Sequence, residues 1–147
     1  MVKPTVQQIL WAQAEFGVII HYDITAFEPS YRFREQWGYY PNPKVFAPSA
    51  LDTDQWVRTA KAAGAKYAIL VVKHCTGFCL FPTEPHSVKQ SSYPGDIADE
   101  FVKSCKKYGL KPGFYYSCAC NGYMQVDNPG YAISKDYKAQ KAYIALC

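Results

Sequence analysis

The chain of 147 residues lacks any continuous apolar run of the roughly 20 residues that a membrane-spanning helix requires. Residues 1–5 contain neither an apolar stretch nor a small-residue cleavage site, so no export signal is expected and the cellular location stays open. The chain also lacks a concentrated block of charge, because its 16 basic and 12 acidic side chains are scattered and give a net charge of +4. We therefore expect neither a membrane nor a nucleic acid as partner.

Zinc-binding motifs are lacking as well. A site built from His74, Cys75, Cys79 and the pair Cys118 and Cys120 is conceivable, but this spacing matches no common C-x-x-C pairing. We therefore predict no metal and no cofactor. The six cysteines lie on apolar runs or helix patterns, so buried, reduced thiols are expected and a disulfide framework is not.

Three strand-like runs are present, at residues 16–21, 67–73 and 113–117. The middle run is apolar without alternation, which is typical of a parallel strand covered on both faces. Helical patterns separate the runs. One covers residues 51–63 and stops at a glycine, a second covers residues 96–108 and stops at another glycine, and a third is predicted to begin near Ser134.

Alternating strands and helices predict parallel βα units in an α/β fold. Each strand ends in reactive side chains followed by a long irregular loop, and in a (β/α)8 TIM barrel that end of every strand faces the active site. An open sheet would prefer a glycine-rich phosphate turn, and the sequence has none. Because a whole barrel takes about 250 residues, we expect residues 1–147 to be the amino-terminal portion of one, with about the first three units.

Candidate binding residues lie at the predicted strand ends. His21 closes the first strand and His74 follows the second, so the two imidazoles are expected to share a polar pocket in which each neutral ring offers one donor and one acceptor. Alternation turns Tyr115 into the barrel and Tyr116 toward the helices. Trp37, in the loop after the first strand, either plugs that loop onto the core or packs against the apolar face of a sugar.

Carboxylates are scarce at the same strand ends. Glycoside hydrolysis commonly requires two of them on either side of the glycosidic bond, about 5 to 5.5 Å apart when configuration is retained. Asp23, Glu35 and Asp127 are the candidates, and they form no convincing pair of nucleophile and acid. Most other acidic residues lie at helix starts or on surfaces, where capping and solvation are the usual roles.

Motifs along nearly the whole chain resemble the opening of the family 29 α-L-fucosidases, in order and at the expected spacing. The most diagnostic are Glu15-x-Gly17 followed by His21, and Lys73-His74-x-x-Gly77-Phe78. The others lie at residues 4–11, 51–56, 62–67, 82–83, 95–97, 108–113 and 115–117.

The resemblance implies a (β/α)8 catalytic domain that hydrolyses terminal α-linked L-fucose from an oligosaccharide or glycoconjugate, with retention through a covalent fucosyl-aspartate. It implies that His21, Trp37, His74 and Tyr115 belong to the fucose pocket. The family's nucleophile follows the fourth strand and its acid/base residue comes later. Both are therefore expected beyond Cys147, and the isolated chain is expected to be inactive.

The sequence departs from the family pattern at two places. The common His-His-Asp-Gly-Phe reads His74-Cys75-Thr76-Gly77-Phe78, so a weak thiol replaces the second imidazole, and Gln36 stands where many relatives have glutamate. Two other functions stay open. One is a sugar-binding module or degenerate fragment without catalysis. The other is an unrelated α/β hydrolase with Cys75 as nucleophile and His74 as base, although neighbours on a strand point to opposite faces and rarely form such a pair.

Overall fold

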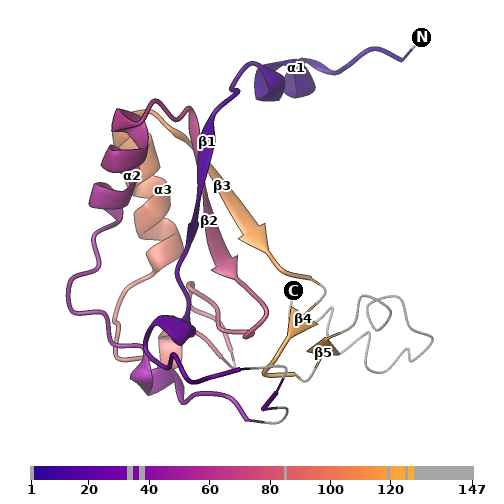
Figure 1. The fold of residues 1–147 in the computed structure, drawn as a ribbon. Coiled ribbons are helices and arrows are strands. Elements are labelled where there is room, and N and C mark those ends of the chain that lie inside the picture. Colours follow the sequence, from indigo (N-terminus) through magenta and orange to yellow (C-terminus); the bar gives the residue numbers. More distant parts are fainter. Residues whose placement is uncertain are drawn as a thin grey trace.

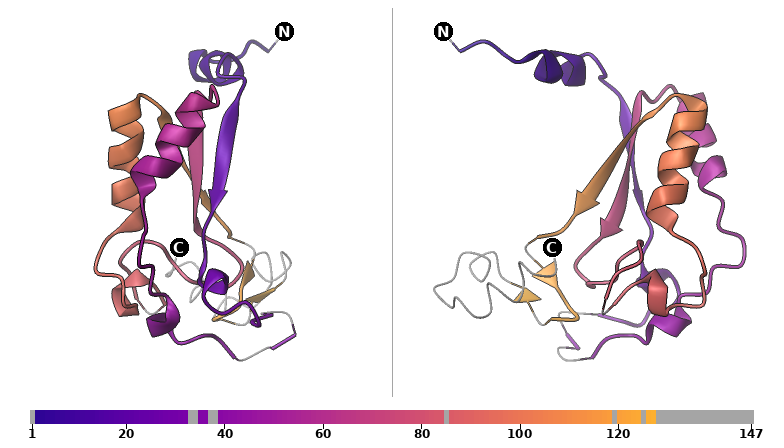
Figure 2. Two further views of the ribbon diagram at one scale, coloured as in Figure 1. Left: turned by 60° about the vertical axis from the view of Figure 1, so that its left-hand side comes forward. Right: turned by 180° about the vertical axis from the view of Figure 1, so that it is seen from behind.

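The computed structural model describes residues 2–32, 35–36, 39–84, 86–118, 120–124 and 126–127. Its centre is a parallel sheet in the order β1-β2-β3, and two helices connect the strands and cover one face of the sheet (Figures 1 and 2). The predicted α/β pattern is confirmed in these elements. In chain order they are β1 Gly17–His21, α2 Thr53–Ala62, β2 Tyr67–Lys73, α3 Ile97–Tyr108 and β3 Lys111–Tyr116.

The start of β3 differs from the prediction. The strand begins at Lys111, where it pairs with Tyr67, and Pro112 lies opposite Ala68. The predicted strand covers residues 113–117 and so starts one residue after Pro112. Within the described residues β3 has a neighbour only on its β2 side, and proline is tolerated on such a strand.

Side-chain caps fix the ends of the two connecting helices. Asp52 accepts a hydrogen bond from the Gln55 amide at 2.9 Å, and Asp96 accepts one from the Asp99 amide at 3.0 Å. α3 ends at Gly109, which has a left-handed φ of +66°. These caps hold the helix ends at fixed places relative to the strands.

The core lies between the sheet and the two helices. Val57 of α2 and Phe101 of α3 are fully buried against Leu70 of β2. The helices also share a buried hydrogen bond of 2.9 Å between Thr53 Oγ1 and Ser104 Oγ. Packing on this face leaves the carboxyl ends of the strands free to carry polar residues.

Several elements of the structure were not predicted from the sequence. α1 (Val6–Ala12) is an exposed helix capped by a reciprocal Thr5 and Gln8 box, a signal that the sequence does contain. A two-stranded antiparallel pair, β4 (Cys120–Asn121) and β5 (Val126–Asp127), follows β3. Short 3₁₀ turns complete the described elements: η1 Ile24–Ala26, η2 Pro43–Val45 and η3 Val88–Gln90. The helix predicted near Ser134 lies outside the described residues.

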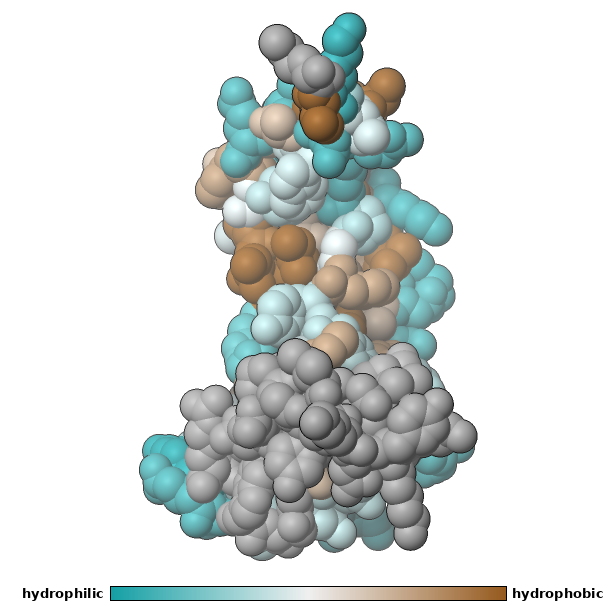
Figure 3. Space-filling view, turned by 90° about the vertical axis from the view of Figure 1, so that its right-hand side faces the viewer, coloured by the Kyte–Doolittle hydropathy of each residue, from teal (hydrophilic) through white to brown (hydrophobic). Residues whose placement is uncertain are grey.

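The second face of the sheet carries no helix among the described elements. Figure 3 views this side of the molecule and shows apolar side chains across its middle. Ile19 of β1 is 67% exposed there, two residues before His21. Of the helices that the structure describes, none has the length and apolar character needed to cross a membrane.

Candidate functional site

The candidate site lies where the three parallel strands end. His21 is the last residue of β1, His74 directly follows β2, and Tyr115 is the penultimate residue of β3. Because parallel strands in register present their carboxyl ends at the same edge, three residues distant in sequence meet there. The structure therefore brings together three of the four predicted site residues.

The rings of this row contact one another. The centroids of His21 and His74 are 4.6 Å apart in an edge-on arrangement, and those of His74 and Tyr115 are 5.9 Å apart. The His21 side chain is 49% exposed and Tyr115 is 45% exposed, while His74 is partly buried. Tyr116 is packed against the core instead, so the predicted difference between the two tyrosines is confirmed. The row presents ring edges and polar atoms to solvent.

Asp23 lies beneath the row and is only 7% exposed. Its Oδ2 is 3.9 Å from His21 Nε2, and its two oxygens accept the hydroxyl of Thr76 at 2.8 and 3.0 Å. The Ile24 amide donates to Oδ1 at 2.7 Å. Since both oxygens are engaged and buried, this carboxylate is suited to hold neighbouring groups and poorly suited to attack a substrate.

The pKa values of the two histidines of the row are shifted in opposite directions. The nearby carboxylate of Asp23 raises the pKa of His21, against a smaller effect of burial. Burial lowers the pKa of His74, and the positive charges of His21 and Lys73 lower it further. As pH falls, His21 therefore gains its proton before His74 does.

Lys73, predicted among the reactive strand-end groups, has a structural contact instead. It is 1% exposed, and its Nζ donates to the carbonyl oxygens of Ser117 and, at 2.7 Å, Cys120. The ammonium thus ties the end of β2 to the segment between β3 and β4. This contact fixes the backbone beside the ring row.

The expectation that His74 and Cys75 point apart is wrong. Both residues lie after the end of β2 in a turn, where strand alternation no longer applies, and Cys75 Sγ is 3.9 Å from His74 Nε2. The expectation that the cysteines are buried is confirmed for Cys79, Cys105 and Cys120 and is wrong for Cys118, which is exposed. Cys147 lies outside the described residues.

The loop after β1 is only partly described. Trp37 lies outside the described residues, so its predicted role stays a prediction. Gln36 accepts a hydrogen bond from the Arg32 amide at 2.6 Å, and both Gln36 and Glu35 are exposed. Asp127 belongs to β5, but its side chain is not described. Among the described side chains, Glu35 makes no ion pair or hydrogen bond with Asp23.

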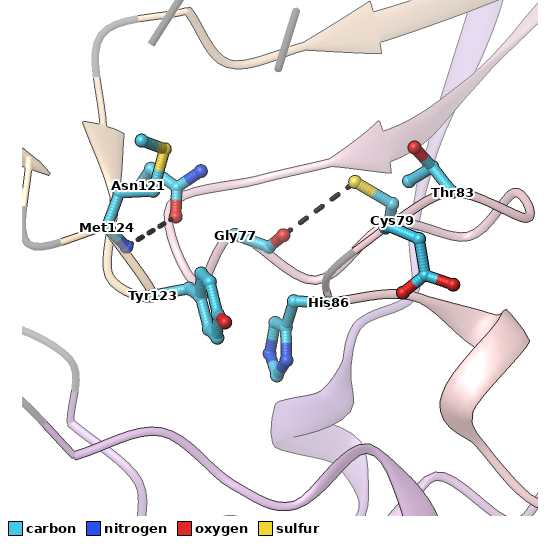
Figure 4. Close-up of a pocket in the computed structure, with 8 residues that line it drawn as sticks. Gly77, Cys79, Thr83, His86, Asn121, Tyr123 and Met124 are labelled. Carbon is cyan, nitrogen blue, oxygen red and sulfur yellow. Dashed lines mark hydrogen bonds between the residues drawn. The ribbon is translucent and has the colours of Figure 1, made fainter. Parts of the chain in front are cut away.

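A second histidine environment was missed in the sequence. His86 is 2% exposed, and neither ring nitrogen has a hydrogen-bond partner among the described residues. Its ring stacks on Tyr123 at 4.9 Å and 15°, beside a small cavity of about 20 Å³ that Gly77 and Asn121 also line (Figure 4). Burial lowers the pKa of His86 to about 4. No periodic pattern surrounds this residue, so the sequence offered little signal for it.

Three side chains could serve as ligands for a cation. The ligand atoms of His21 and His74 in the row and of Asp23 beside it lie within 4.8 Å of one another. Asp23 already accepts from Thr76 and Ile24, however, and His21 and His74 lack the tight spacing of a zinc tetrahedron. We assign no metal to these residues.

Comparison with known proteins identifies the family of the chain. The family model described as alpha-L-fucosidase matches residues 25–145. Alpha-L-fucosidase 1 of Arabidopsis thaliana is 35% identical over 120 residues, which cover 78% of this chain and 23% of the plant protein. The chain thus spans about a quarter of that relative's length.

Solved structures extend the similarity to the fold. A Bacteroides thetaiotaomicron VPI-5482 protein assigned to the α-L-fucosidases is 35% identical, with a TM-score of 0.84 over 98% of this chain and 35% of that one. An α-L-fucosidase of Lactobacillus casei in complex with α-L-fucose product is 26% identical, with a TM-score of 0.66 over 77% of this chain and 41% of that one. By family model, sequence and structure, the chain belongs to the α-L-fucosidases.

Proposed function

We propose that residues 1–147 contribute the first three βα units of a (β/α)8 catalytic domain that hydrolyses terminal α-linked L-fucose with retention. Three observations support the architecture: the strands are parallel and in chain order, both connecting helices cover one face, and polar side chains gather at the strand ends. The substrates proposed are fucosylated oligosaccharides or glycoconjugates.

The row of His21, His74 and Tyr115 across three neighbouring strand ends is the observation that carries this proposal. A sugar presents several hydroxyls in fixed directions, and imidazoles at fixed angles match such a pattern better than flexible side chains do. Tyr115 adds an exposed ring edge and a phenol. Trp37 completes the proposed pocket as a ring for the apolar face of the sugar.

The different pKa directions of the two histidines fit this use. His21, whose pKa is raised, serves as a hydrogen-bond donor over a wider pH range. His74 stays neutral, so one ring nitrogen is left to accept from a hydroxyl. Contacts that tighten as the sugar ring distorts would contribute to rate as well as to affinity.

Sugar binding is tested by NMR, because the chain has only three histidines. Titration with L-fucose should move the imidazole resonances of His21 and His74 and leave buried His86 unchanged. D-fucose, the mirror image, is the matched control, since it has the same groups in the wrong arrangement. Equal responses to both enantiomers, or none to either, would reject the proposed pocket.

Hydrolysis is tested separately with an aryl α-L-fucoside, on a protein in which residues 1–147 are followed by the remaining units of the proposed barrel, because the isolated chain is expected to be inactive. Cleavage of the α-L-fucoside beside an uncleaved aryl β-D-galactoside supports the activity, and His74→Ala and Tyr115→Ala should reduce kcat/KM at unchanged folding. Selective binding of L-fucose without any cleavage would instead favour the non-catalytic binding module.

A further inference from the structure

A directed chain of buried hydrogen bonds connects the loop after β2 to the end of β1. The Phe78 amide donates to Thr76 Oγ1 at 3.2 Å, so the Thr76 hydroxyl is left to give its own proton to Asp23. Thr76 is 4% exposed and Asp23 is 7% exposed, which keeps competing water away. With the Ile24 amide on Oδ1, the Asp23 carboxylate is held in one rotamer.

Oδ2 of this fixed carboxylate lies 3.9 Å from His21 Nε2, within ion-pair range and beyond hydrogen-bonding distance. Building on the proposed fucose pocket, we infer that Asp23 and Thr76 are a positioning pair: Thr76 holds Asp23, and the Asp23 charge attracts the Nε2 side of the His21 ring and so orients the ring for sugar binding. With Nε2 turned to Asp23, Nδ1 is left to face the ligand and donates to a sugar hydroxyl when the ring is protonated. Neither member of the pair needs to touch the sugar.

Thr76 allows the buried Asp23 carboxylate to stay ionised beside His21. An aspartate at position 76 would put a second carboxylate at hydrogen-bonding distance from a buried one, and two such groups cannot both stay ionised. A threonine supplies the hydroxyl proton with no charge. The Asp23 and Thr76 pair therefore explains in physical terms why a hydroxyl stands in this loop at the position where the family motif has a carboxylate.

Other groups also surround His21. His74 and Lys73 lie on the β2 side, and Tyr115 lies on β3 beside His74. The pKa of His21 is nevertheless raised, with Asp23 as the largest cause. The effect of the Asp23 carboxylate on the His21 pKa outweighs the opposing effect of burial.

The test measures His21 directly, in the presence of EDTA so that no adventitious metal takes part. In the unmodified chain, ¹⁵N shifts should report the Nε2-protonated tautomer, and the His21 pKa should lie above that of His74. Asp23→Asn should lower the His21 pKa and weaken L-fucose binding roughly fivefold to tenfold. An unchanged His21 titration in Asp23→Asn would overturn the inference.

Thr76 is tested with paired variants. Thr76→Val should disorder the His21 ring and weaken L-fucose binding by about the same factor, whereas Thr76→Ser keeps the hydroxyl and should restore both. Thr53→Val is the matched control, because it removes another buried hydroxyl, bonded to Ser104, far from the row.

The outcomes separate the two proposals. Failure of the unmodified chain to bind L-fucose would count against the proposed function, while the His21 tautomer and titration would still decide the role of Asp23. Should Asp23→Asn fail to fold, the tautomer of the unmodified chain and the Thr76→Ser and Thr76→Val comparison carry the decision. The inference is refuted if the His21 ring is as ordered in Thr76→Val as in the unmodified chain.

Discussion

The buried imidazole of His86 predicts a loss of stability in mild acid. The ring is enclosed by Tyr123, Phe78 at 5.4 Å and Tyr40 at 5.6 Å, and it is 2% exposed. These aromatic neighbours leave no acceptor for a charged ring among the described contacts. A proton on His86 therefore costs burial energy in the folded chain that it does not cost in the unfolded chain.

The size and sign of the effect follow from linkage. The folded pKa is about 4 against an ordinary value of 6.5, so between these values the unfolded chain binds more protons than the folded one. The contribution is fully present above pH 6.5 and is lost as pH falls through 4. A difference of about 2.5 pKa units amounts to roughly 3 kcal/mol, of which about 2 kcal/mol should be lost by pH 5.

His86→Phe is the matched perturbation, since it keeps an aromatic ring of similar size and removes the titrating group. The free energy of unfolding of both proteins is measured with urea at steps between pH 4 and pH 8. The carboxylates that titrate near pH 4 are common to both proteins and cancel in the comparison. The parent should fall by about 3 kcal/mol more than His86→Phe across this range. Parallel stability curves would refute the argument that His86 is buried neutral.

Three further predictions concern the frame around the site. Lys73→Met should destabilise the chain by about 2 kcal/mol in urea unfolding, because the carbonyls of Ser117 and Cys120 lose a buried donor. Gly109→Ala should cost about 1 kcal/mol by the same assay, because a φ of +66° strains any residue with a Cβ. Iodoacetamide should label exposed Cys118 in the folded chain and spare Cys105, whose pKa burial raises to about 11.

The parts of the fold that repeat along the chain were predictable. Apolar runs indicate strands β1 and β2, and apolar periodicity with a glycine stop indicates helices α2 and α3. The predicted bounds of each element lie within a few residues of those in the structure. Elements of two residues, such as β4 and β5, are too short to leave a period. α1 has its capping box, but its residues are exposed in the structure, so no buried stripe reinforced the signal.

The candidate site was predictable only one strand at a time. His21, His74 and Tyr115 could be placed at strand ends from local pattern, and parallel pairing then brings them together. The contact of Thr76 with Asp23 joins residues 53 positions apart through side-chain rotamers, which no local spacing encodes. The contact of Cys75 with His74 was missed because alternation was applied beyond the last residue of β2.

The three histidines then differ because their surroundings differ, although all three are the same chemical group. His21 lies beside a fixed carboxylate, His74 is affected mainly by burial, and His86 lies against aromatic rings. At neutral pH the row therefore combines a histidine biased toward donating with one biased toward staying neutral. Such a pair can contact two hydroxyls of different orientation, and a symmetric pair of neutral rings would distinguish them less. The buried Asp23 carboxylate, itself outside the ring row, accounts for the His21 side of that asymmetry, and burial accounts for the His74 side.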